Sequence, residues 1–310
     1  MSTIITKRQF PNYKVYEMEL AGRPLKLEVG KVCELANAAV VVRYGETTVL
    51  CTATAAPRPR DGIDFFPLSV DFEEKLYAVG RIPGSFMRRE GRPGLNAILA
   101  SRCIDRPIRP LFPSDFRNDV AVVCTVLSVD YDCQPEIAAT IGTSAALAIS
   151  DIPWNGPVGC VNVGYVDGKI IINPNQEQRK VSEMLTTVVA TGEKVVMIEA
   201  GANQVSNEVM LEGIEKGFEE AKKQVALINQ MVAEIGKEKF DYPHADFNEE
   251  LFQKILDFGM EEAMAAMDTD DKNVREARWN VLVDHLYEQF LEEYPDMDQY
   301  LEEITYKFQK

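Results

Sequence analysis

The sequence has few of the residues that most catalytic motifs use. Its 310 residues include only two histidines, His244 and His285, and its six cysteines form no CxxC pair. A GxxxxGK[ST] phosphate loop, an HExxH metal motif and a GxSxG nucleophile elbow are also missing. Both histidines stand in an acidic helical region, where a surface role or a hydrogen-bonded core role is the ordinary one. These absences exclude P-loop, zincin and α/β-hydrolase chemistry.

Long apolar runs are missing as well. No stretch approaches the roughly 20 residues of a membrane-spanning helix, and the N-terminal MSTIITKRQF lacks the apolar core of a signal peptide. The cysteines stand mostly in apolar surroundings, which favours reduced core residues over disulfides or a zinc site. We therefore expect a cytoplasmic protein with no membrane segment.

Acidic residues are in excess, but they are unevenly placed. The formal net charge is −16, and residues 206–310 hold 26 acids against 11 bases. Residues 75–117 instead hold nine basic residues, eight of them arginine, against three acids. Because charges are screened beyond roughly 8 to 10 Å, the local potential decides whether a polyanion binds. The arginine-rich segment is thus a candidate polyanion-binding surface.

The first two thirds of the chain mix strands and helices. Residues 14–74 alternate as short strands, which predicts an antiparallel meander with turns at Gly22 and Gly45. A buried strand is expected next, flanked by helices, and two hairpins follow. The expected helices span 96–110 and 135–150, the strand 119–130, and the hairpins 159–174 and 186–200.

The last third shows helical spacing. Helices are expected at 208–235, 248–267 and 271–308, with charged residues on their outer faces. The order of elements predicts an α+β domain over residues 1–240, followed by an all-α domain over residues 241–310.

The segment 80–94 is predicted to be a loop because glycine and proline interrupt it throughout. Phe86 and Met87 stand directly before Arg88 and Arg89, and Arg92 follows. Stacking of a base on an aromatic ring contributes about 1 to 3 kcal/mol, and arginines add salt-dependent phosphate contacts. A clamp for single-stranded nucleic acid and a solvated basic loop with an apolar anchor both fit this composition.

Three further arginines, Arg102, Arg106 and Arg109, follow at spacings of four and three, so that a helix places them on one side. Only one acid, Asp105, stands close to them in the sequence. The remaining positive charge calls for an anion or water, and a substrate phosphate is the candidate.

Three aspartates near the loop are candidates for metal ligands or acid-base groups: Asp61, Asp64 and Asp71. The pair Asp61-Gly62 is more typical of a turn, and Asp71 is expected at the end of a strand. The sequence alone therefore gives no strong metal site here.

Two stretches, FFPLSVDFEEKLYAVGRIPGSFMRREGRP and ASRCIDRPIRPLFP, closely resemble the first ribonuclease PH-like core of bacterial polynucleotide phosphorylases. The acidic helical stretch resembles the all-α domain that follows this core, so the resemblance covers essentially the whole chain. It implies an α+β ribonuclease PH-like core followed by an all-α domain. The most specific parts are GRIPGSF, RREGRP and IDRPIRPLFP.

The resemblance implies an enzyme of RNA degradation, a polyribonucleotide nucleotidyltransferase. Such an enzyme uses inorganic phosphate to release nucleoside diphosphates from the 3′ end of RNA, and it can run backwards as a polymerase. Single-stranded RNA and inorganic phosphate are the implied partners, in a homotrimeric ring with a central channel. Proteins of an RNA degradosome are further candidate partners.

The resemblance also assigns residues. Phe86, Arg88 and Arg89 match the channel loop that grips RNA, and Arg92 matches the arginine after it. Met87 stands where the family commonly has a second aromatic side chain, and it can still pack on a base. Arg102 and Arg106 match arginines of the helix that follows, so that they are expected to bind RNA or an anion.

The implied chemistry lies beyond this sequence. In the family, a second core that should begin after Lys310 holds a divalent magnesium ion with two aspartates spaced D-x5-D. Here Lys180 and Thr186 stand at the corresponding places. Glu177 and Glu183 have the same six-residue spacing but do not stand at those places.

We therefore expect no catalytic residue and no metal site in this chain, and an isolated fragment that binds RNA without phosphorolysis. The alternative is a non-catalytic RNA-binding or ring-assembly module of an exosome-like complex.

Overall fold

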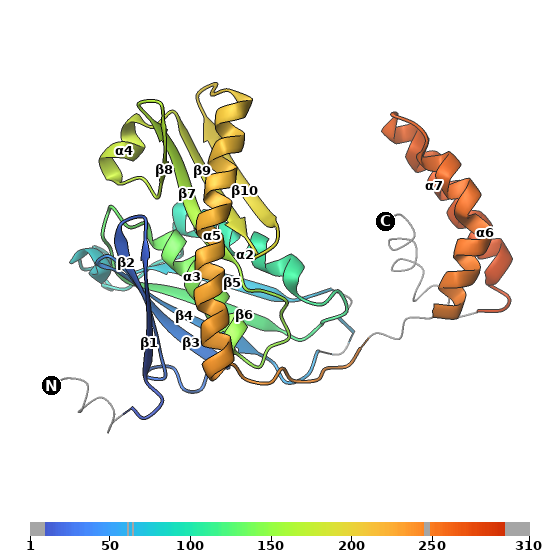
Figure 1. Ribbon diagram of the computed structural model, residues 1–310. Coiled ribbons are helices and arrows are strands. Elements are labelled where there is room, and N and C mark those ends of the chain that lie inside the picture. Colours follow the sequence, from blue (N-terminus) through green and yellow to red (C-terminus); the bar gives the residue numbers. More distant parts are fainter. Residues whose placement is uncertain (1–9, 61, 64, 245–248, 295–310) are drawn as a thin grey trace. The chain divides into compact units, whose positions relative to one another are not determined.

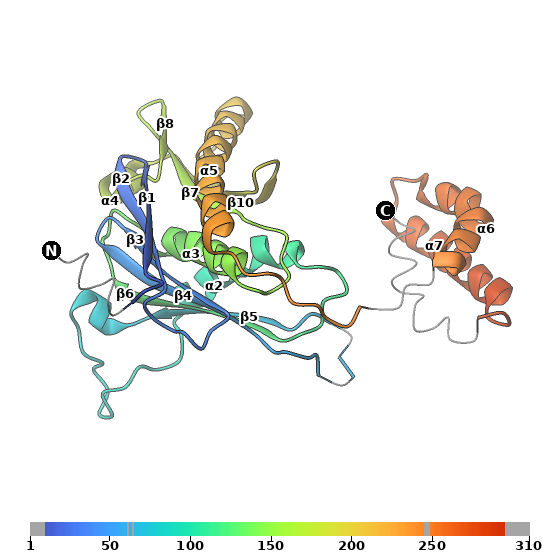
Figure 2. The ribbon, with the colours of Figure 1, turned by 60° about the horizontal axis from the view of Figure 1, so that its bottom comes forward.

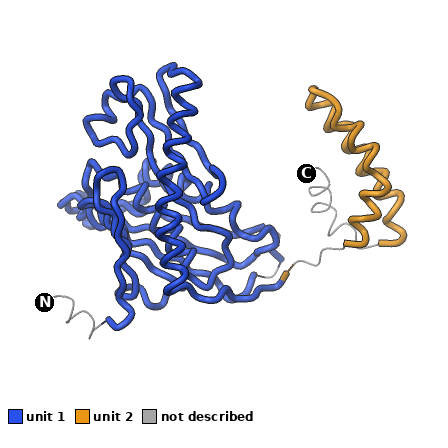
Figure 3. The backbone as a smooth tube through the Cα atoms, in the orientation of Figure 1, with its two compact units in different colours: residues 1–243 blue, residues 244–310 orange. Residues whose placement is uncertain are grey.

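The chain divides into two compact units, which Figure 3 shows in different colours. The computed structural model describes residues 10–60, 62–63, 65–244 and 249–294. Unit 1 spans Met1–Pro243 and unit 2 spans His244–Lys310. Unit 1 contains both helices and strands, whereas the described part of unit 2 contains helices only (Figure 1). The predicted α+β class is confirmed.

Within the described residues, six strands of unit 1 form one sheet in the order β1-β2-β3-β4-β6-β5. The first four form the predicted antiparallel meander. The strands are Lys14–Leu20 (β1), Arg23–Val29 (β2), Ala38–Tyr44 (β3), Thr47–Ala55 (β4), Leu68–Glu74 (β5) and Val120–Ser128 (β6). The strand at the end of the predicted meander region, β5, does not continue it and pairs in parallel with β6. Parallel neighbours need a crossover connection, and the helix after β5 lies in that crossover.

A second sheet, of four antiparallel strands, has the order β10-β9-β7-β8 in the described part of unit 1. Its strands are Gly159–Val166 (β7), Lys169–Ile172 (β8), Met184–Ala190 (β9) and Val195–Ala202 (β10). Both predicted hairpins are confirmed. The first turns at Asp167 and Gly168, whose φ angles of 49° and 72° suit a two-residue hairpin turn.

A short helix that the sequence analysis missed, Gln176–Val181 (α4), connects β8 to β9. Its start is fixed by a capping box, in which the Asn175 side chain accepts from the Gln178 backbone amide and the Gln178 side chain accepts from that of Asn175. The spacing N-x-x-Q is the local signal that could have revealed it.

One buried helix, Pro135–Ile149 (α3), lies between the two sheets (Figures 1 and 2). It packs on β3 and β4 of the first sheet and on β7 of the second. Every residue from 137 to 149 is buried, which explains the small side chains that the sequence places there. A Cβ on Gly142 would lie 2.4 Å from Val42 Cγ2, so this close packing requires glycine.

Two more helices flank this centre. The helix Leu95–Ile108 (α2) packs on β5 and α3, and the long helix Asn207–Ile235 (α5) packs on β7 and β9. The buried amide of Gln224 fixes α5 to β7, since it accepts from the backbone N of Cys160 (2.8 Å) and donates to its carbonyl (3.0 Å). This pair satisfies backbone groups that burial would otherwise leave unpaired.

Unit 2 is a helical hairpin over its described residues, formed by Glu249–Met267 (α6) and Lys272–Phe290 (α7). Helices at both places were predicted, although the part expected beyond residue 294 lies outside the described residues. The Asp271 side chain caps α7 by accepting from the Asn273 and Val274 amides. His285 forms a surface ion pair with Glu262 (3.0 Å), and this hydrogen bond raises the pKa of the imidazole.

The cysteines are all unpaired. Four are buried, as expected for core residues: Cys51, Cys124, Cys133 and Cys160. Cys103 is half-buried, whereas Cys33 departs from the expectation because it is exposed. Within the described ranges, no helix has the length and apolar character needed to cross a membrane.

The side chain of Lys239 forms hydrogen bonds with backbone carbonyl groups at the C-terminal end of α3. Its Nζ donates to the carbonyls of Leu147 (3.1 Å), Ala148 (3.0 Å) and Ser150 (2.6 Å). Removing a cation from a helix C-terminus and leaving carbonyls unpaired costs about 2 kcal/mol. We predict that Lys239→Met lowers the free energy of unfolding by this amount in urea titrations. Lys223→Met, on the exposed face of α5, is the control and should change it by less than about 0.5 kcal/mol; equal losses would contradict the prediction.

Candidate functional site

The loop between the 3-10 helix Leu76–Val79 (η1) and α2 extends away from the sheets (Figure 2). Phe86 at its tip is 100% exposed and Met87 is 65% exposed. A turn positions them, in which the Arg88 amide donates to the Ser85 carbonyl (2.9 Å). The second half of the loop is held by Glu90, whose carboxylate accepts a hydrogen bond from the Leu76 backbone amide (3.0 Å). The loop therefore presents an aromatic ring directly to solvent.

The loop also presents unneutralised positive charge. Arg88, Arg89 and Arg92 are all exposed. Within the part of the chain that the structure describes, none of these side chains forms a hydrogen bond or an ion pair. A guanidinium without a protein partner is available for a phosphate, which it can bind through two parallel hydrogen bonds.

The three arginines of the following helix differ from one another. Arg109 binds Asp105 through two hydrogen bonds (2.8 and 3.0 Å). It also donates to the carbonyls of Phe66 (3.3 Å) and Leu68 (3.0 Å). These contacts tie the end of α2 to the start of β5, so the guanidinium is already occupied. In the structure Arg109 therefore joins α2 to β5, and phosphate binding by Arg109 stays a prediction.

Arg106 and Arg102 are more accessible. Arg106 pairs with Glu199 of β10 at 2.7 Å, and both side chains are more than half exposed. The sequence analysis counted only one acid near these arginines, because Glu199 is 93 residues away in the chain. Arg102 is exposed and has no ion pair within the described residues. Anion binding by Arg102 and Arg106 stays a prediction.

The residues at the D-x5-D positions do not fit a metal ion. Lys180 is a cation that pairs with Glu177 (2.6 Å), and the Thr186 hydroxyl faces α5, where it donates to Met210 Sδ (3.6 Å). No cluster of three or more His, Cys, Asp or Glu side chains suited to a metal occurs among the described residues. Asp71 lies inside β5 rather than at its end, and Asp61 and Asp64 lie outside the described residues.

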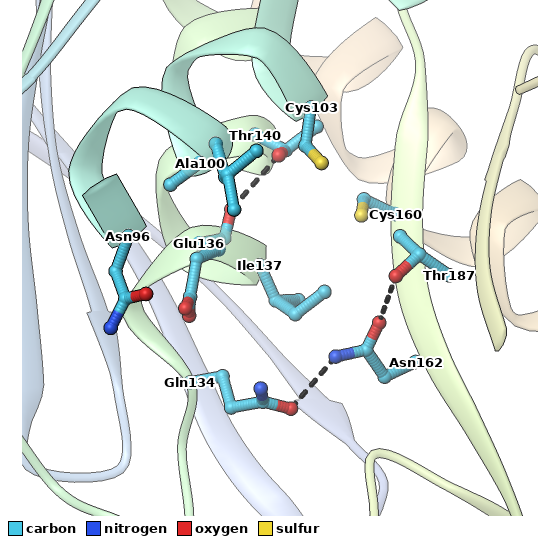
Figure 4. A pocket seen from close by; sticks show the side chains of 11 residues that line it. Asn96, Ala100, Cys103, Gln134, Glu136, Ile137, Thr140, Cys160, Asn162 and Thr187 are labelled. Carbon is cyan, nitrogen blue, oxygen red and sulfur yellow. Dashed lines mark hydrogen bonds between the residues drawn. The ribbon is translucent and has the colours of Figure 1, made fainter. Parts of the chain in front are cut away.

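A cavity of about 250 Å³ lies between α2, α3, β7 and β9 (Figure 4). Its polar lining comes from all four elements and the residue before α3: Asn96, Gln134, Glu136, Thr140, Asn162 and Thr187. The sequence analysis missed this site. Two local signals were present, namely Asn162 inside the apolar strand GCVNVGYV and an acid at the start of the small-residue helix.

A chain of hydrogen bonds orders one side of this cavity. The Thr187 hydroxyl donates to Asn162 Oδ1 (2.6 Å), and Asn162 Nδ2 donates to Gln134 Oε1 (2.7 Å). Figure 4 shows Glu136 and Asn96 on the other side. Within the described residues the buried oxygen Glu136 Oε2 has no hydrogen-bond partner. Burial raises the pKa of this carboxyl group, whereas a hydrogen bond from the backbone of Glu136 itself opposes the rise. The charge of Glu74 adds to the rise and that of Arg179 opposes it.

This carboxyl group gives stability a pH dependence. Because the folded-state pKa of Glu136 lies above its ordinary value of 4.5, its share of stability is present below pH 4.5 and is lost as the pH rises through the folded-state pKa. The variant Glu136→Gln does not titrate there. We predict that it gains about 1 kcal/mol over the parent protein at pH 8 and that this gain shrinks toward pH 5. Urea unfolding across this range measures it, and a gain independent of pH would contradict the cause.

Two sheets around one buried helix, with a basic loop beside them, define a ribonuclease PH-like protein. Two family models, described as 3′ exoribonuclease family, domain 1 and domain 2, match residues 21–153 and 156–220. The chain belongs to this 3′ exoribonuclease family, and the resemblance that its motifs carry is confirmed. The first match holds the six-stranded sheet from β2 on with α2 and α3, and the second holds the four-stranded sheet.

Its relatives are named polyribonucleotide nucleotidyltransferase. The relative from Ruminiclostridium cellulolyticum is 52% identical over 298 residues, which cover 96% of this chain and 42% of the relative. That from Clostridioides difficile is 54% identical over 260 residues, covering 84% of this chain and 37% of the relative. The chain thus spans about two fifths of the length of these curated relatives.

A solved structure supports the fold. The crystal structure of rice (Oryza sativa) Rrp46 aligns with a TM-score of 0.55 at 16% identity, and the alignment covers 69% of this chain and 96% of that chain. At this identity the likeness concerns the fold alone.

Proposed function

We propose that this chain is the RNA-binding first core and helical domain of a phosphorolytic 3′–5′ exoribonuclease. The whole protein would use inorganic phosphate to release nucleoside diphosphates from RNA and could polymerise them in reverse. The names of the relatives support this reaction class. The observation that carries the RNA-binding role is the loop that exposes Phe86 beside Arg88, Arg89 and Arg92.

The loop suits single-stranded RNA for a physical reason. An exposed ring offers a base a stacking surface of about 1 to 3 kcal/mol, and it accepts any base because each has a π-face. Guanidinium groups two and three residues away would meet the neighbouring phosphates. Met87 would add an adaptable apolar contact. Arg102 and Arg106, on the helix after the loop, would extend the path for phosphates.

We assign the bond-breaking step to another part of the whole protein. A magnesium ion there would neutralise charge that develops on the phosphoryl group. In this chain Lys180 and Thr186 cannot supply the carboxylate pair that would hold this ion. The part played by residues 1–240 and 241–310 would be to hold RNA and to build the particle.

The proposed particle is a cytoplasmic homotrimer that encloses an RNA channel and could join RNA-degradosome proteins. Apolar side chains beside the basic loop support an assembly surface. Tyr77 is 55% exposed, Ile82 68% and Leu95 71%. These residues are close in sequence to the basic loop, and exposed apolar side chains that gather on a surface are typical of interaction sites. The same observation favours the second candidate function, a non-catalytic ring-assembly module of an exosome-like complex.

Two measurements on the 310-residue chain test the proposal. Fluorescence anisotropy with a labelled single-stranded RNA should show binding that weakens steeply with salt. Incubation with RNA, phosphate and magnesium should release no nucleoside diphosphate. Absence of RNA binding at low salt would overturn the RNA-binding role. Release that Glu177→Gln or Glu183→Gln abolishes would overturn the assignment of the chemistry to another part of the protein.

A further inference from the structure

Glu90 stands among the arginines of the loop between η1 and α2, but in the described structure it forms no ion pair with any of them. It follows Arg89 directly and precedes Arg92 by two residues. Its carboxylate instead accepts a hydrogen bond from the backbone amide of Leu76 (3.0 Å), fourteen residues earlier in the chain. A carboxylate beside guanidinium groups ordinarily pairs with one of them, because such contacts are charge-assisted. Here the arginines stay available for phosphates, and the acid binds the backbone.

The backbone of Leu76 holds both halves of this loop. Its amide donates to Glu90 in the second half, and its carbonyl accepts from the backbone amide of Arg81 in the first half (2.9 Å). Gly80, with a φ angle of 68°, turns the chain between them. In the part of the chain that the structure describes, no other hydrogen bond joins residues 82–93 to residues outside that range. The hydrogen bond of Glu90 therefore closes the loop.

The point of closure is connected to the first sheet. Leu76 follows Lys75, whose ammonium group pairs with Glu73 of β5 (2.9 Å). The Thr125 hydroxyl of β6 donates to the same Glu73 carboxylate (3.1 Å). The hydrogen bond with Glu73 raises the pKa of Lys75, and the charge of Glu90 adds to this rise. Glu90 thus attaches the loop to a segment that two strands of the sheet hold in place.

We propose that Glu90 is a positioning residue for RNA, which closes the loop on Leu76 and so holds its exposed aromatic ring and its arginines in the arrangement that binds RNA. This role rests on the proposed function of the loop. A loop that is closed near both ends has fewer conformations than an open one. Less conformational entropy is then lost when RNA orders the side chains at the tip, and the affinity is higher.

The sign of the effect separates positioning from charge. Glu90 is exposed, so its negative charge repels the phosphates of RNA, and loss of the charge alone would strengthen RNA binding. Loss of the closing hydrogen bond would weaken binding instead. Glu90→Ala removes both the charge and the hydrogen bond. Glu90→Gln removes the charge but keeps a side-chain oxygen that can accept from the Leu76 amide.

The first test measures RNA affinity with the full 310-residue chain and a labelled single-stranded RNA. Fluorescence anisotropy at about 100 mM salt should show that Glu90→Ala weakens binding about fivefold, which corresponds to about 1 kcal/mol. Glu90→Gln should bind at least as tightly as the parent protein. Glu193→Ala removes the same charge from the turn between β9 and β10 and should not weaken binding. Equal or tighter binding by Glu90→Ala overturns the positioning role.

The second test measures closure of the loop without RNA. Trypsin should cleave after Arg88 and Arg89 at least about threefold faster in Glu90→Ala than in the parent protein, because cleavage follows local opening. Glu90→Gln should be cleaved at the rate of the parent protein. Equal cleavage rates for Glu90→Ala and the parent protein overturn the proposal.

A variant at the other end of the hydrogen bond checks the same contact. Leu76→Pro removes the amide donor at the first position of η1, where proline is tolerated. The backbone of Lys75, with φ −93° and ψ 132°, is already extended, as the residue before a proline requires. Leu76→Pro should accelerate cleavage as Glu90→Ala does, and the double variant should add nothing further. Additive effects in the double variant overturn the proposal.

The outcomes for RNA separate this proposal from the proposed function. RNA binding by the parent protein that Glu90→Ala does not weaken overturns the positioning role and leaves the proposed function standing. Absence of RNA binding by the parent protein at low salt overturns the proposed function, and with it the role of Glu90 in RNA binding, whatever the cleavage rates are.

Discussion

Replacing Arg88 and Arg89 together by alanine is expected to weaken RNA binding by the 310-residue chain about 30-fold in low salt. Each free guanidinium neutralises one phosphate, and a charge-assisted contact of this kind is worth roughly 1 kcal/mol or more. For single strands, the slope of log affinity against log salt changes by about 0.7 for each phosphate contact. The double variant should therefore flatten the slope by about 1.4, measured by anisotropy between 50 and 200 mM salt.

A matched pair of arginines separates this effect from charge in general. Arg43 of β3 and Arg60 of the segment between β4 and β5 carry the same two charges, but each is paired with a carboxylate, on Glu28 and Asp119 respectively. Arg43→Ala with Arg60→Ala should change RNA affinity less than threefold. Equal losses in the two double variants would mean that the loop is merely part of a diffuse positive field.

The loop was predictable because its determinants are local. Glycine and proline interrupt residues 80–94 throughout, and no helix or strand period survives there. The state of the helix arginines was not predictable. Arg109 is occupied by Asp105 and by two carbonyls of the β5 region, and Arg106 meets Glu199 of β10. Only the packing of α2 on β5 and its approach to β10 bring these groups together.

The cavity could not be predicted for a related reason. Four elements separated by long stretches of sequence supply its polar side chains, and each alone has an ordinary explanation. An acid in the first turn of a helix, such as Glu136, is favoured by the helix dipole wherever it stands. That one of its oxygens is buried without a partner is a property of the folded chain and not of the local sequence.

Neighbouring side chains of β9 lie on opposite faces of the sheet, so an alignment error of one residue changes which side chain is expected at the cavity. Thr186 faces α5, whereas the next residue, Thr187, faces the cavity. A shift of one residue in the comparison with the D-x5-D motif moves the expected side chain from one face of the sheet to the other. The aligned position at Thr186 is therefore on the face away from the cavity.

The contact between α5 and β7 gives the second large expected effect. A Cβ on Gly159 would lie 2.3 Å from the Ala221 carbonyl oxygen and 2.9 Å from its carbonyl carbon. Both atoms belong to the backbone of α5, so no side-chain rotation relieves the overlap. The helix would have to move away from the strand, although Gln224 ties it to the neighbouring Cys160. Overpacking of this kind typically costs 1 to 3 kcal/mol and occasionally more.

We predict that Gly159→Ala lowers the free energy of unfolding by about 3 kcal/mol, measured by urea titration. Gly201→Ala is the matched control, since Gly201 lies in β10 of the same sheet and an added Cβ there meets no atom within 4 Å. That control should be neutral or slightly stabilising, because alanine loses less backbone entropy than glycine. Similar unfolding midpoints for the two variants would show that α5 can shift on β7 without loss. The tight contact at Gly159 would then not be what holds β7 in place. It would also not be what positions Asn162, the cavity residue on the same strand.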